Sequence, residues 1–296
     1  MTAPAAEDDA QQKHRHASRL AAAMANANRE DFPTRLASTL PESVRSLVHD
    51  VAPRKRLRDL VLDRAVRAEV QDFIEEYVQT ALLRSHSLEP RHTALLIGPP
   101  GAGKTSLASA LASDLRIPLL VVRYDGLVGG LPGETAARIQ QVLDYASRFP
   151  CIVFFDEFET TGKERGDSDV ARVATSLLLQ MLALPSHCVV ICATTHPELL
   201  DRAVWRRFEM RLALSLPTTN ELKEWFLRTE RSVGHLGITA QEFVTVLRGE
   251  ASSEVEAITL DMRRKLVLSS GTVTSAEAFR LALDAWERRH LMAGSF

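Results

Sequence analysis

Cysteine is scarce in this sequence, and its spacing argues against a structural metal site. The 296 residues include three cysteines, Cys151, Cys188 and Cys192. They lie in or beside apolar runs, and the one Cys-x-x-x-Cys pair has neither a second pair nor a spaced histidine to complete a zinc site. We therefore expect three buried thiols.

Long apolar runs and a charge imbalance are also lacking. No run approaches the roughly 18 apolar residues that span a bilayer, and residues 7–9 are acidic, whereas a signal peptide would begin with basic residues. The formal net charge of −2 provides no bulk attraction to nucleic acid or anionic lipid. We expect a cytoplasmic protein without a membrane partner. Nucleic acid is a disfavoured partner, because binding it would need a local basic patch.

A strand–loop–helix pattern predicts a phosphate-binding loop. Residues 98–105 match the G-x-x-x-x-G-K-[ST] spacing, after an apolar run at 94–97 and before a helical stretch at 106–112. The glycines let backbone N–H groups approach phosphates, and the helix N-terminus adds partial positive charge. We expect Lys104 to hold the β- and γ-phosphates of ATP and the Thr105 hydroxyl to ligate Mg²⁺. The predicted nucleotide-binding residues are Gly98, Pro99, Pro100, Gly101, Ala102, Gly103, Lys104, Thr105 and Ser106.

Two carboxylates at the end of an apolar run form a second predicted constellation. The run at 151–155 is followed directly by Asp156 and Glu157. Alone, it would be read as a strand that ends at a solvated turn, but beside a phosphate loop we favour a catalytic pair. Asp156 would hold Mg²⁺ together with Thr105, and Glu157 would orient and deprotonate the attacking water.

Strands and helices alternate over the middle of the chain, and helices alone follow. An amphipathic helix is expected over 63–84, because apolar residues recur there at three and four positions. The alternation that follows predicts a parallel sheet with helices on both faces. Pro217 marks the end of the alternation. The expected strands are 94–97, 119–122, 152–155, 189–193 and 210–214, and the expected C-terminal helices are 221–232, 240–248, 253–268 and 275–289.

In their order along the chain, these motifs resemble those of the AAA+ ATPases, in particular the AAA branch that includes stand-alone bacterial members. The resemblance covers most of the chain, from about residue 60 to residue 289. Residues 98–105 are similar to the Walker A motif and residues 154–159 to Walker B. Residues 193–201 resemble the stretch that carries the polar sensor, and residues 203–208 resemble the arginine-finger segment.

The resemblance implies a fold with three parts. Residues 56–217 are expected to form an α/β P-loop NTPase domain with a parallel sheet, which is the large domain of AAA+ proteins. Residues 218–296 are expected to form an all-α lid domain. Residues 1–55 remain as a partly disordered, partly helical extension and are the one candidate adaptor region.

Three further residues receive roles from the resemblance, and the pore loop departs from it. Thr195 stands where this branch usually has an asparagine sensor. Its hydroxyl can still hold a water or a γ-phosphate oxygen, so we expect hydrolysis to be retained but slower. Arg206 and Arg207 are both candidates for the arginine finger that enters a neighbouring subunit. Leu131 and Pro132 replace the aromatic residue of the pore loop. Leucine cannot stack and proline supplies no N–H donor, which argues against processive threading of a polypeptide.

The function implied by the resemblance is ATP-driven remodelling of a protein partner. The chain would be a Mg²⁺-dependent ATPase that works as a homo-oligomeric ring, commonly a hexamer. Its client is unidentified, and a separately encoded peptidase or a defence partner would both suit the family. Two alternatives remain open. A DNA-associated loader or regulator is disfavoured by the near-neutral charge, whereas a slow ATP-gated scaffold or switch is favoured by Thr195 and the atypical pore loop.

Overall fold

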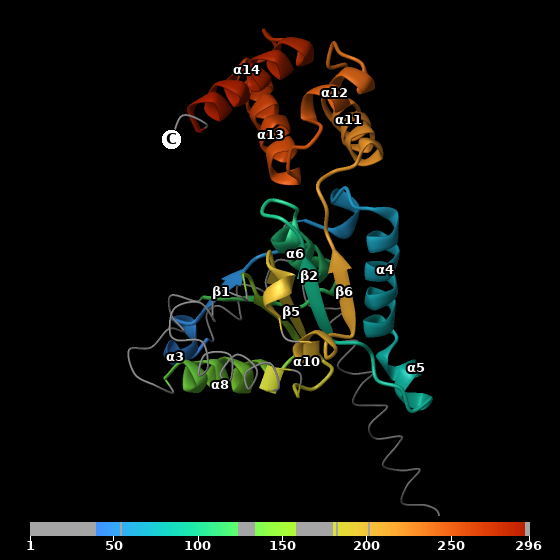
Figure 1. The fold of residues 1–296 in the computed structure, drawn as a ribbon, viewed down its shortest axis with the longest axis vertical. Coiled ribbons are helices and arrows are strands. Elements are labelled where there is room, and N and C mark those ends of the chain that lie inside the picture. Colours follow the sequence, from blue (N-terminus) through green and yellow to red (C-terminus); the bar gives the residue numbers. More distant parts are fainter. Residues whose placement is uncertain are drawn as a thin grey trace, which may run out of the picture.

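The computed structural model of this chain shows an α/β domain joined to a helical domain (Figure 1). The expected pore-loop residues Leu131 and Pro132 lie outside the described residues, as do residues 1–39 and the last two positions of the Walker B stretch. The structure describes residues 40–53, 55–123, 134–157, 180–181, 183–200 and 202–293.

The α/β domain is built on a six-stranded sheet with one antiparallel edge. The strands are β1 (Val48–Val51), β2 (Thr93–Ile97), β3 (Leu119–Val122), β4 (Cys151–Phe155), β5 (Cys188–Thr194) and β6 (Met210–Ala213). They stand in the order β1-β3-β4-β5-β2-β6. All neighbouring pairs run parallel except β1 and β3. The predicted parallel sheet is confirmed for β2 to β6, and the antiparallel edge is a correction to it.

The edge strand β1 was not predicted, because its sequence lacks an apolar run. Val48 is buried, but His49 is exposed and the rest of the strand is at least partly exposed. The strand is specified by its partner: Val48 lies opposite Val122 in β3, and the N–H of Arg123 donates to the Leu47 carbonyl at 2.8 Å. Its conformation therefore follows from its position at the sheet edge and not from intrinsic hydrophobicity.

The long helix predicted over 63–84 is divided in two at Gln79. The two helices are α4 (Arg64–Val78) and α5 (Thr80–Ser85). Asp63 caps the first, because its carboxylate accepts hydrogen bonds from two N–H groups of the first turn at 2.7 and 3.4 Å. At the break, the Thr80 hydroxyl donates to the Tyr77 carbonyl at 2.6 Å. Such a local side-chain hydrogen bond competes with the backbone hydrogen bonds of the helix. The apolar periodicity alone could not reveal this break.

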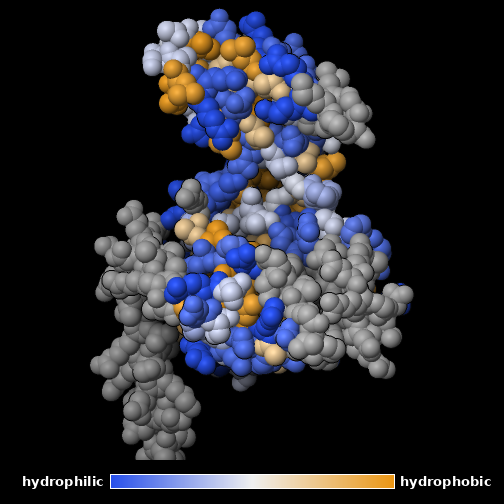
Figure 2. Space-filling view, turned by 90° about the vertical axis from the view of Figure 1, so that its left-hand side faces the viewer, coloured by the Kyte–Doolittle hydropathy of each residue, from blue (hydrophilic) through white to orange (hydrophobic). Residues whose placement is uncertain are grey.

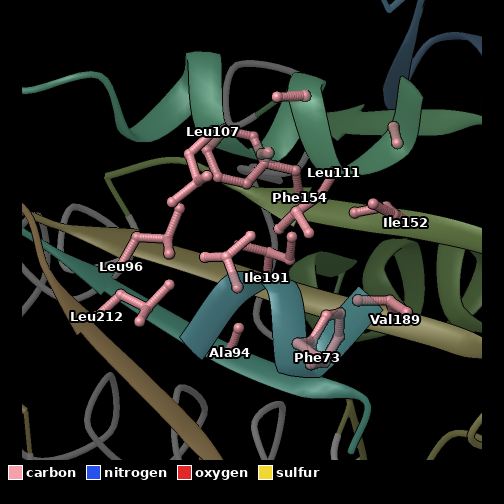
Figure 3. Close-up of a cluster of buried hydrophobic side chains, with 14 of the residues drawn as sticks. Phe73, Ala94, Leu96, Leu107, Leu111, Ile152, Phe154, Val189, Ile191 and Leu212 are labelled. Atoms are coloured by element: carbon pink, nitrogen blue, oxygen red, sulfur yellow. The ribbon is translucent and has the colours of Figure 1, made fainter. Parts of the chain in front are cut away.

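Helices cover both faces of the sheet, and each face has its own apolar cluster. The other helices of this domain that lie within the described residues are α3 (Glu42–Arg45), η1 (Leu57–Asp59), α6 (Lys104–Leu115), α8 (Glu134–Ala146), η3 (Pro197–Leu199) and α10 (Arg202–Trp205). Side chains alternate along a strand, so Ile152 and Phe154 of β4 pack in the cluster with α4 and α6. Val153 and Phe155 pack in the cluster with α3 and α8. Figure 3 shows the first cluster, in which Phe73 of α4 joins the strands.

The three cysteines are buried free thiols within the sheet, as predicted. Cys151 and Cys188 are paired residues at the start of β4 and β5, with their Sγ atoms 3.7 Å apart. Their mutual hydrogen bond and burial raise the pKa of Cys151, and burial raises the pKa of Cys192. The raised pKa values keep Cys151 and Cys192 protonated at neutral pH, so both act as packing groups.

Four helices form the C-terminal domain, which has its own core and confirms the predicted all-α part. The helices are α11 (Thr219–Val233), α12 (Ala240–Leu247), α13 (Ser252–Leu268) and α14 (Ser275–Ala293). Thr218 and Thr239 each form a capping box with the glutamate three residues later. Phe243 packs against Phe226 and Phe279, with ring centroids 5.6 and 5.8 Å apart. Among the described helices, none combines the length and apolar character needed to cross a membrane.

The packing of α4 on the sheet can be tested at Phe73, which is fully buried. Replacing Phe73 with Ala should lower the free energy of unfolding by about 3–5 kcal/mol, because it leaves a cavity between α4 and the strands. Urea denaturation followed by circular dichroism measures this loss. Val78→Ala, on the exposed side of the same helix, is the matched control and should change stability by less than about 0.5 kcal/mol. Equal losses in the two variants would contradict the packing of α4.

Candidate functional site

A cavity of about 350 Å³ lies between the α/β domain and the helical domain. Figure 2 shows the molecule narrowing at this level. Residues 100–106, which follow β2, form one wall together with the residues just after β4 and β5. Residues 59–62, which precede α4, form a second wall. The first turn of α13 and Trp225 of α11 form the third. The cavity thus draws on both domains.

The glycines of the predicted phosphate loop are required by backbone conformation and by close packing. Gly101 has a φ of +74° and Gly103 a φ of +97°, in the left-handed region that favours glycine. A Cβ on Gly101 would lie 2.4 Å from Ser253 Oγ, and one on Gly98 would lie 2.1 Å from the Leu214 carbonyl oxygen. The loop leads directly into α6, whose N-terminus has no side-chain cap and carries partial positive charge. This arrangement suits an anion.

Lys104 is buried at the start of α6, with its ammonium held at the loop. Its Nζ donates to the carbonyl oxygens of Gly98 at 2.7 Å and Pro99 at 3.0 Å. A buried charge needs such partners to offset its desolvation. Gly98 and Pro99 therefore do not line the cavity, and their carbonyl oxygens bind the Lys104 ammonium. Residues 100–106 line the cavity itself.

The structure brings Thr105 and Asp156 together across 51 positions of sequence. The Thr105 hydroxyl donates to Asp156 Oδ2 at 2.8 Å, and the Glu157 N–H donates to Asp156 Oδ1 at 3.1 Å. Hydroxyl and carboxylate oxygens are the donors that Mg²⁺ accepts, usually one or two from the protein with phosphates and water completing the shell. The donor set therefore fits Mg²⁺. No cluster of three or more His, Cys, Asp or Glu suitable for a metal occurs within the described ranges.

Glu157 adopts a backbone conformation that is rare for a residue with a side chain. Its φ is +45°, in the left-handed region that is sparsely populated outside glycine. It lines the same cavity as Lys104 and Thr105. Strained residues of this kind cluster at functional sites, where the surrounding structure holds them. The sharp turn after β4 thus presents both carboxylates at the cavity wall.

The remaining predicted site residues fall in two different places. Thr195 follows β5 and lines the cavity. Arg206 and Arg207 follow α10, are exposed, and are not among the residues that line the cavity. The Arg207 carbonyl accepts a hydrogen bond from Thr93 Oγ1 at 3.5 Å. Because Thr93 begins β2 and the phosphate loop follows the other end of that strand, the arginines lie away from the cavity of their own chain.

Several residues that line the cavity belong to no recognisable sequence motif. Lys55 forms an ion pair with Glu256 of α13, and Trp225 lies in the helix that was expected over 221–232 without a role at the site. Contacts between the domains bring these residues to the loop. Ser253 N–H donates to the Gly101 carbonyl at 3.0 Å. Arg228 donates to the carbonyls of Arg58 and Leu60 at 2.9 and 3.2 Å. Only the tertiary structure reveals this wall, since Arg228 and its acceptors are about 170 residues apart in sequence and Lys55 and Glu256 are 201 apart.

The sheet order and the loop between β2 and α6 define a P-loop nucleotide-binding protein. Within this class, residues 94–216 match the model of the ATPase family associated with various cellular activities (AAA). Over these residues the match confirms the AAA resemblance that the motifs predicted.

The chain is also similar to individual proteins from several organisms. The chain is 29% identical to the AAA family ATPase y4kL of Sinorhizobium fredii over 253 residues, 84% of this chain and 76% of that protein. It is 32% identical to a putative 26S proteasome regulatory subunit homolog of Methanothermobacter thermautotrophicus, over 62% of this chain and 50% of that one. It is 33% identical to the peroxisomal ATPase pex6 of Schizosaccharomyces pombe, over 54% of this chain and 18% of that protein.

Trp225 offers a direct test of the cavity. Addition of Mg²⁺·ATP should change the intrinsic tryptophan fluorescence, because a ligand in the cavity alters the surroundings of the half-buried indole of Trp225. Trp225→Phe should lose most of this change. Trp205→Phe is the matched control. Trp205 packs against the apolar cluster on the sheet face with α3 and α8, and it does not line the cavity. If the response persists in Trp225→Phe and vanishes in Trp205→Phe, ATP does not occupy this cavity.

Proposed function

We propose that this chain hydrolyses ATP in a Mg²⁺-dependent reaction. One observation carries the proposal: Thr105 of the phosphate loop hydrogen-bonds Asp156 at 2.8 Å, with Glu157 on the wall of the same cavity. Phosphoryl transfer needs positioning and charge neutralisation more than covalent chemistry. Three features are together sufficient for phosphoryl transfer. They are a loop that binds phosphates, two oxygen ligands for Mg²⁺ and a carboxylate that accepts a proton from the attacking water.

Each group of the cavity has a role in this reaction. Backbone N–H groups of the loop and of the first turn of α6 bind the phosphates. The Lys104 ammonium, now on the Gly98 and Pro99 carbonyls, can turn to the β- and γ-phosphates. Thr105 and Asp156 hold Mg²⁺, which when bound neutralises phosphate charge. Glu157 takes the proton of the attacking water, and the Thr195 hydroxyl orients that water or a γ-phosphate oxygen.

Glu157→Gln tests the role of the carboxylate. The amide keeps the shape but cannot accept a proton, so phosphate release should fall by about 10²–10⁴-fold while the calorimetric affinity for ATP stays close to wild type. Glu287→Gln on the exposed side of α14 is the matched control and should hydrolyse ATP at the wild-type rate. Wild-type turnover in Glu157→Gln would mean that the base lies elsewhere.

We also propose that the active form is a homo-oligomeric ring, with six subunits by analogy with the family. The position of Arg206 and Arg207 supports this, because both are exposed and lie at the end of β2 away from the loop. An arginine placed there has a catalytic use only in the site of a neighbouring copy. Such a finger supplies on the order of 10³–10⁵ in rate where it has been measured.

The client that we propose is a protein. The relatives named as a proteasome regulatory subunit homolog and a peroxisomal ATPase support this, and the first makes a separately encoded peptidase a reasonable partner. A defence partner and a DNA-associated role rest on family analogy, and the net charge of −2 disfavours DNA. An ATPase assay with added DNA, and then with a candidate protein, separates these cases.

A slow ATP-gated switch is the second candidate function, and Thr195 favours it. This residue lines the cavity with a hydroxyl where the family usually has an amide. Slow turnover in every condition, with nucleotide-dependent assembly, would support the switch. Turnover stimulated by a protein would support the remodeller.

Mixing of inactive variants tests the trans role of the arginines. Arg206→Ala and Arg207→Ala should each bind ATP, and the one that removes the finger should lose hydrolysis. Lys104→Ala loses ATP binding but still carries both arginines. In a mixed ring the second variant completes the site of the first, so part of the activity should return.

The mixing experiment needs two checks. Sedimentation of the mixture must show that the Lys104→Ala chain assembles with its partner. Each variant alone must remain inactive at the same total concentration. Co-assembled rings without recovery for either arginine would exclude the trans role.

A further inference from the structure

The turn between α10 and β6 carries both exposed arginines and is fixed by the two residues that follow them. Arg206 and Arg207 are exposed on this turn. Phe208 is buried in the apolar cluster on the sheet face with α3 and α8, and Glu209 comes next, directly before β6. Figure 1 shows α10 beside the start of β6. The arginines are therefore joined to the sheet by a very short stretch of chain.

One oxygen of the Glu209 carboxylate accepts hydrogen bonds from three groups at the start of β2. Glu209 Oε2 lies 2.9 Å from the His92 nitrogen, 3.2 Å from the Thr93 nitrogen and 3.0 Å from the Thr93 hydroxyl oxygen. The Glu209 N–H donates in return to Thr93 Oγ1 at 3.1 Å. Hydrogen bonds to an ionised carboxylate are roughly twice as strong as those between neutral groups. This side chain therefore attaches the turn to β2.

The attachment reaches Arg207 through Thr93, whereas Arg206 is held by α10. The Thr93 hydroxyl has one proton and two acceptors, Glu209 Oε2 at 3.0 Å and the Arg207 carbonyl oxygen at 3.5 Å. The Arg206 N–H instead donates to the Arg202 carbonyl at 3.2 Å. Thr93 is buried, so its position is set by the sheet. The main chain of Arg207 is thus linked to β2 by the same hydroxyl that Glu209 binds.

A side chain that acts in the site of a neighbouring copy needs an accurately placed main chain. Arginine has a long and flexible side chain, and a displacement of about 1 Å at a reacting group can cost about 10²-fold in rate. Groups of this kind are held by neighbouring residues whose hydrogen bonds fix their geometry. The Glu209 carboxylate supplies such bonds to this turn.

We propose that Glu209 is a positioning residue for Arg207, and that Arg207 is the arginine that enters the neighbouring site. The inference rests on the proposed ring, and it assigns the trans role to one of the two candidate arginines. Glu209 is not among the residues that line the cavity. It acts by holding the turn against β2, so that Arg207 leaves the surface at a fixed point.

Two explanations of a slow Glu209 variant have to be separated. The strand β2 begins at Thr93 and leads into the phosphate loop, so loss of the Glu209 carboxylate can damage the chain's own site or the arginine that it lends. Damage to the chain's own site persists whatever its neighbour carries. A misplaced arginine, in contrast, is replaced when the neighbour supplies an intact one.

Replacing Glu209 with Ala should lower ATP hydrolysis by about 10–10²-fold, because Arg207 is no longer held in place. Calorimetric ATP affinity and sedimentation in Mg²⁺·ATP should stay at wild type. Glu209→Gln keeps an acceptor oxygen in the same shape and should retain more activity. Glu242→Ala is the matched control, because the Glu242 carboxylate accepts the same kinds of hydrogen bond from the Thr239 N–H and hydroxyl, at 2.7 and 2.8 Å, in the helical domain. This control should hydrolyse ATP at the wild-type rate, and an equally active Glu209→Ala would contradict the inference.

Subunit mixing gives the decisive readout. Lys104→Ala cannot bind ATP but has an intact turn, so Glu209→Ala mixed with it should regain activity as far as Arg207→Ala does. Glu209→Ala mixed with Arg207→Ala should stay slow, because neither chain lends a working arginine. Thr93→Val removes the shared hydroxyl and keeps the branched shape that suits a strand. It should behave like Glu209→Ala in the same mixtures, and it carries the test if circular dichroism shows that Glu209→Ala does not fold.

The mixtures also separate this inference from the proposed function. If Arg207→Ala recovers with Lys104→Ala but Glu209→Ala and Thr93→Val do not, the positioning role is wrong and the proposed ring stands. Recovery of Arg206→Ala without recovery of Arg207→Ala would also overturn the inference, because Arg206 would then be the arginine that enters the neighbour. If neither arginine variant recovers, the proposed trans role fails first.

Discussion

The parallel pairing of β4, β5 and β2 is the constraint on which the site depends. Ile97 lies opposite Thr194, so β2 and β5 end together, and β4 ends beside them. Each strand then delivers polar groups to one edge: the phosphate loop after β2, Asp156 and Glu157 after β4, and Thr195 after β5. Strands buried on both faces are held by apolar contacts along their length. The spacing of the polar groups is therefore fixed by the core beneath them.

The second domain completes the cavity through polar contacts, several of which use backbone groups of the α/β domain. Ser253 donates to the carbonyl of Gly101 in the loop, and Arg228 binds two carbonyls in the segment before α4. Both contacts use the backbone of the α/β domain as acceptor, so they depend on its shape and not on its side chains. A ligand that fills the space between the domains adds contacts to both walls. Such a ligand would favour the arrangement of the domains in which it contacts both walls.

Motifs and apolar runs sufficed to predict the central strands and the P-loop, because buried parallel strands and glycine loops depend on local sequence. Elements specified by tertiary contacts were missed. β1 follows from its pairing with β3, and the break at Gln79 coincides with a hydrogen bond of the Thr80 hydroxyl. Lys55 and Trp225 reach the cavity because the helical domain folds back over the loop. No local pattern marks such residues, since their role depends on a distant partner.

The left-handed backbone of Glu157 lowers the stability of the fold at a residue that the chemistry of the site uses. Its φ of +45° is one that glycine or asparagine adopts at lower cost, and strain of this kind costs about 1–3 kcal/mol. Glycine and asparagine would relieve the strain but lack a carboxylate. Sequence drift that favours stability would therefore replace the glutamate. The carboxylate at position 157 is therefore held at the cavity wall at the expense of a more stable turn.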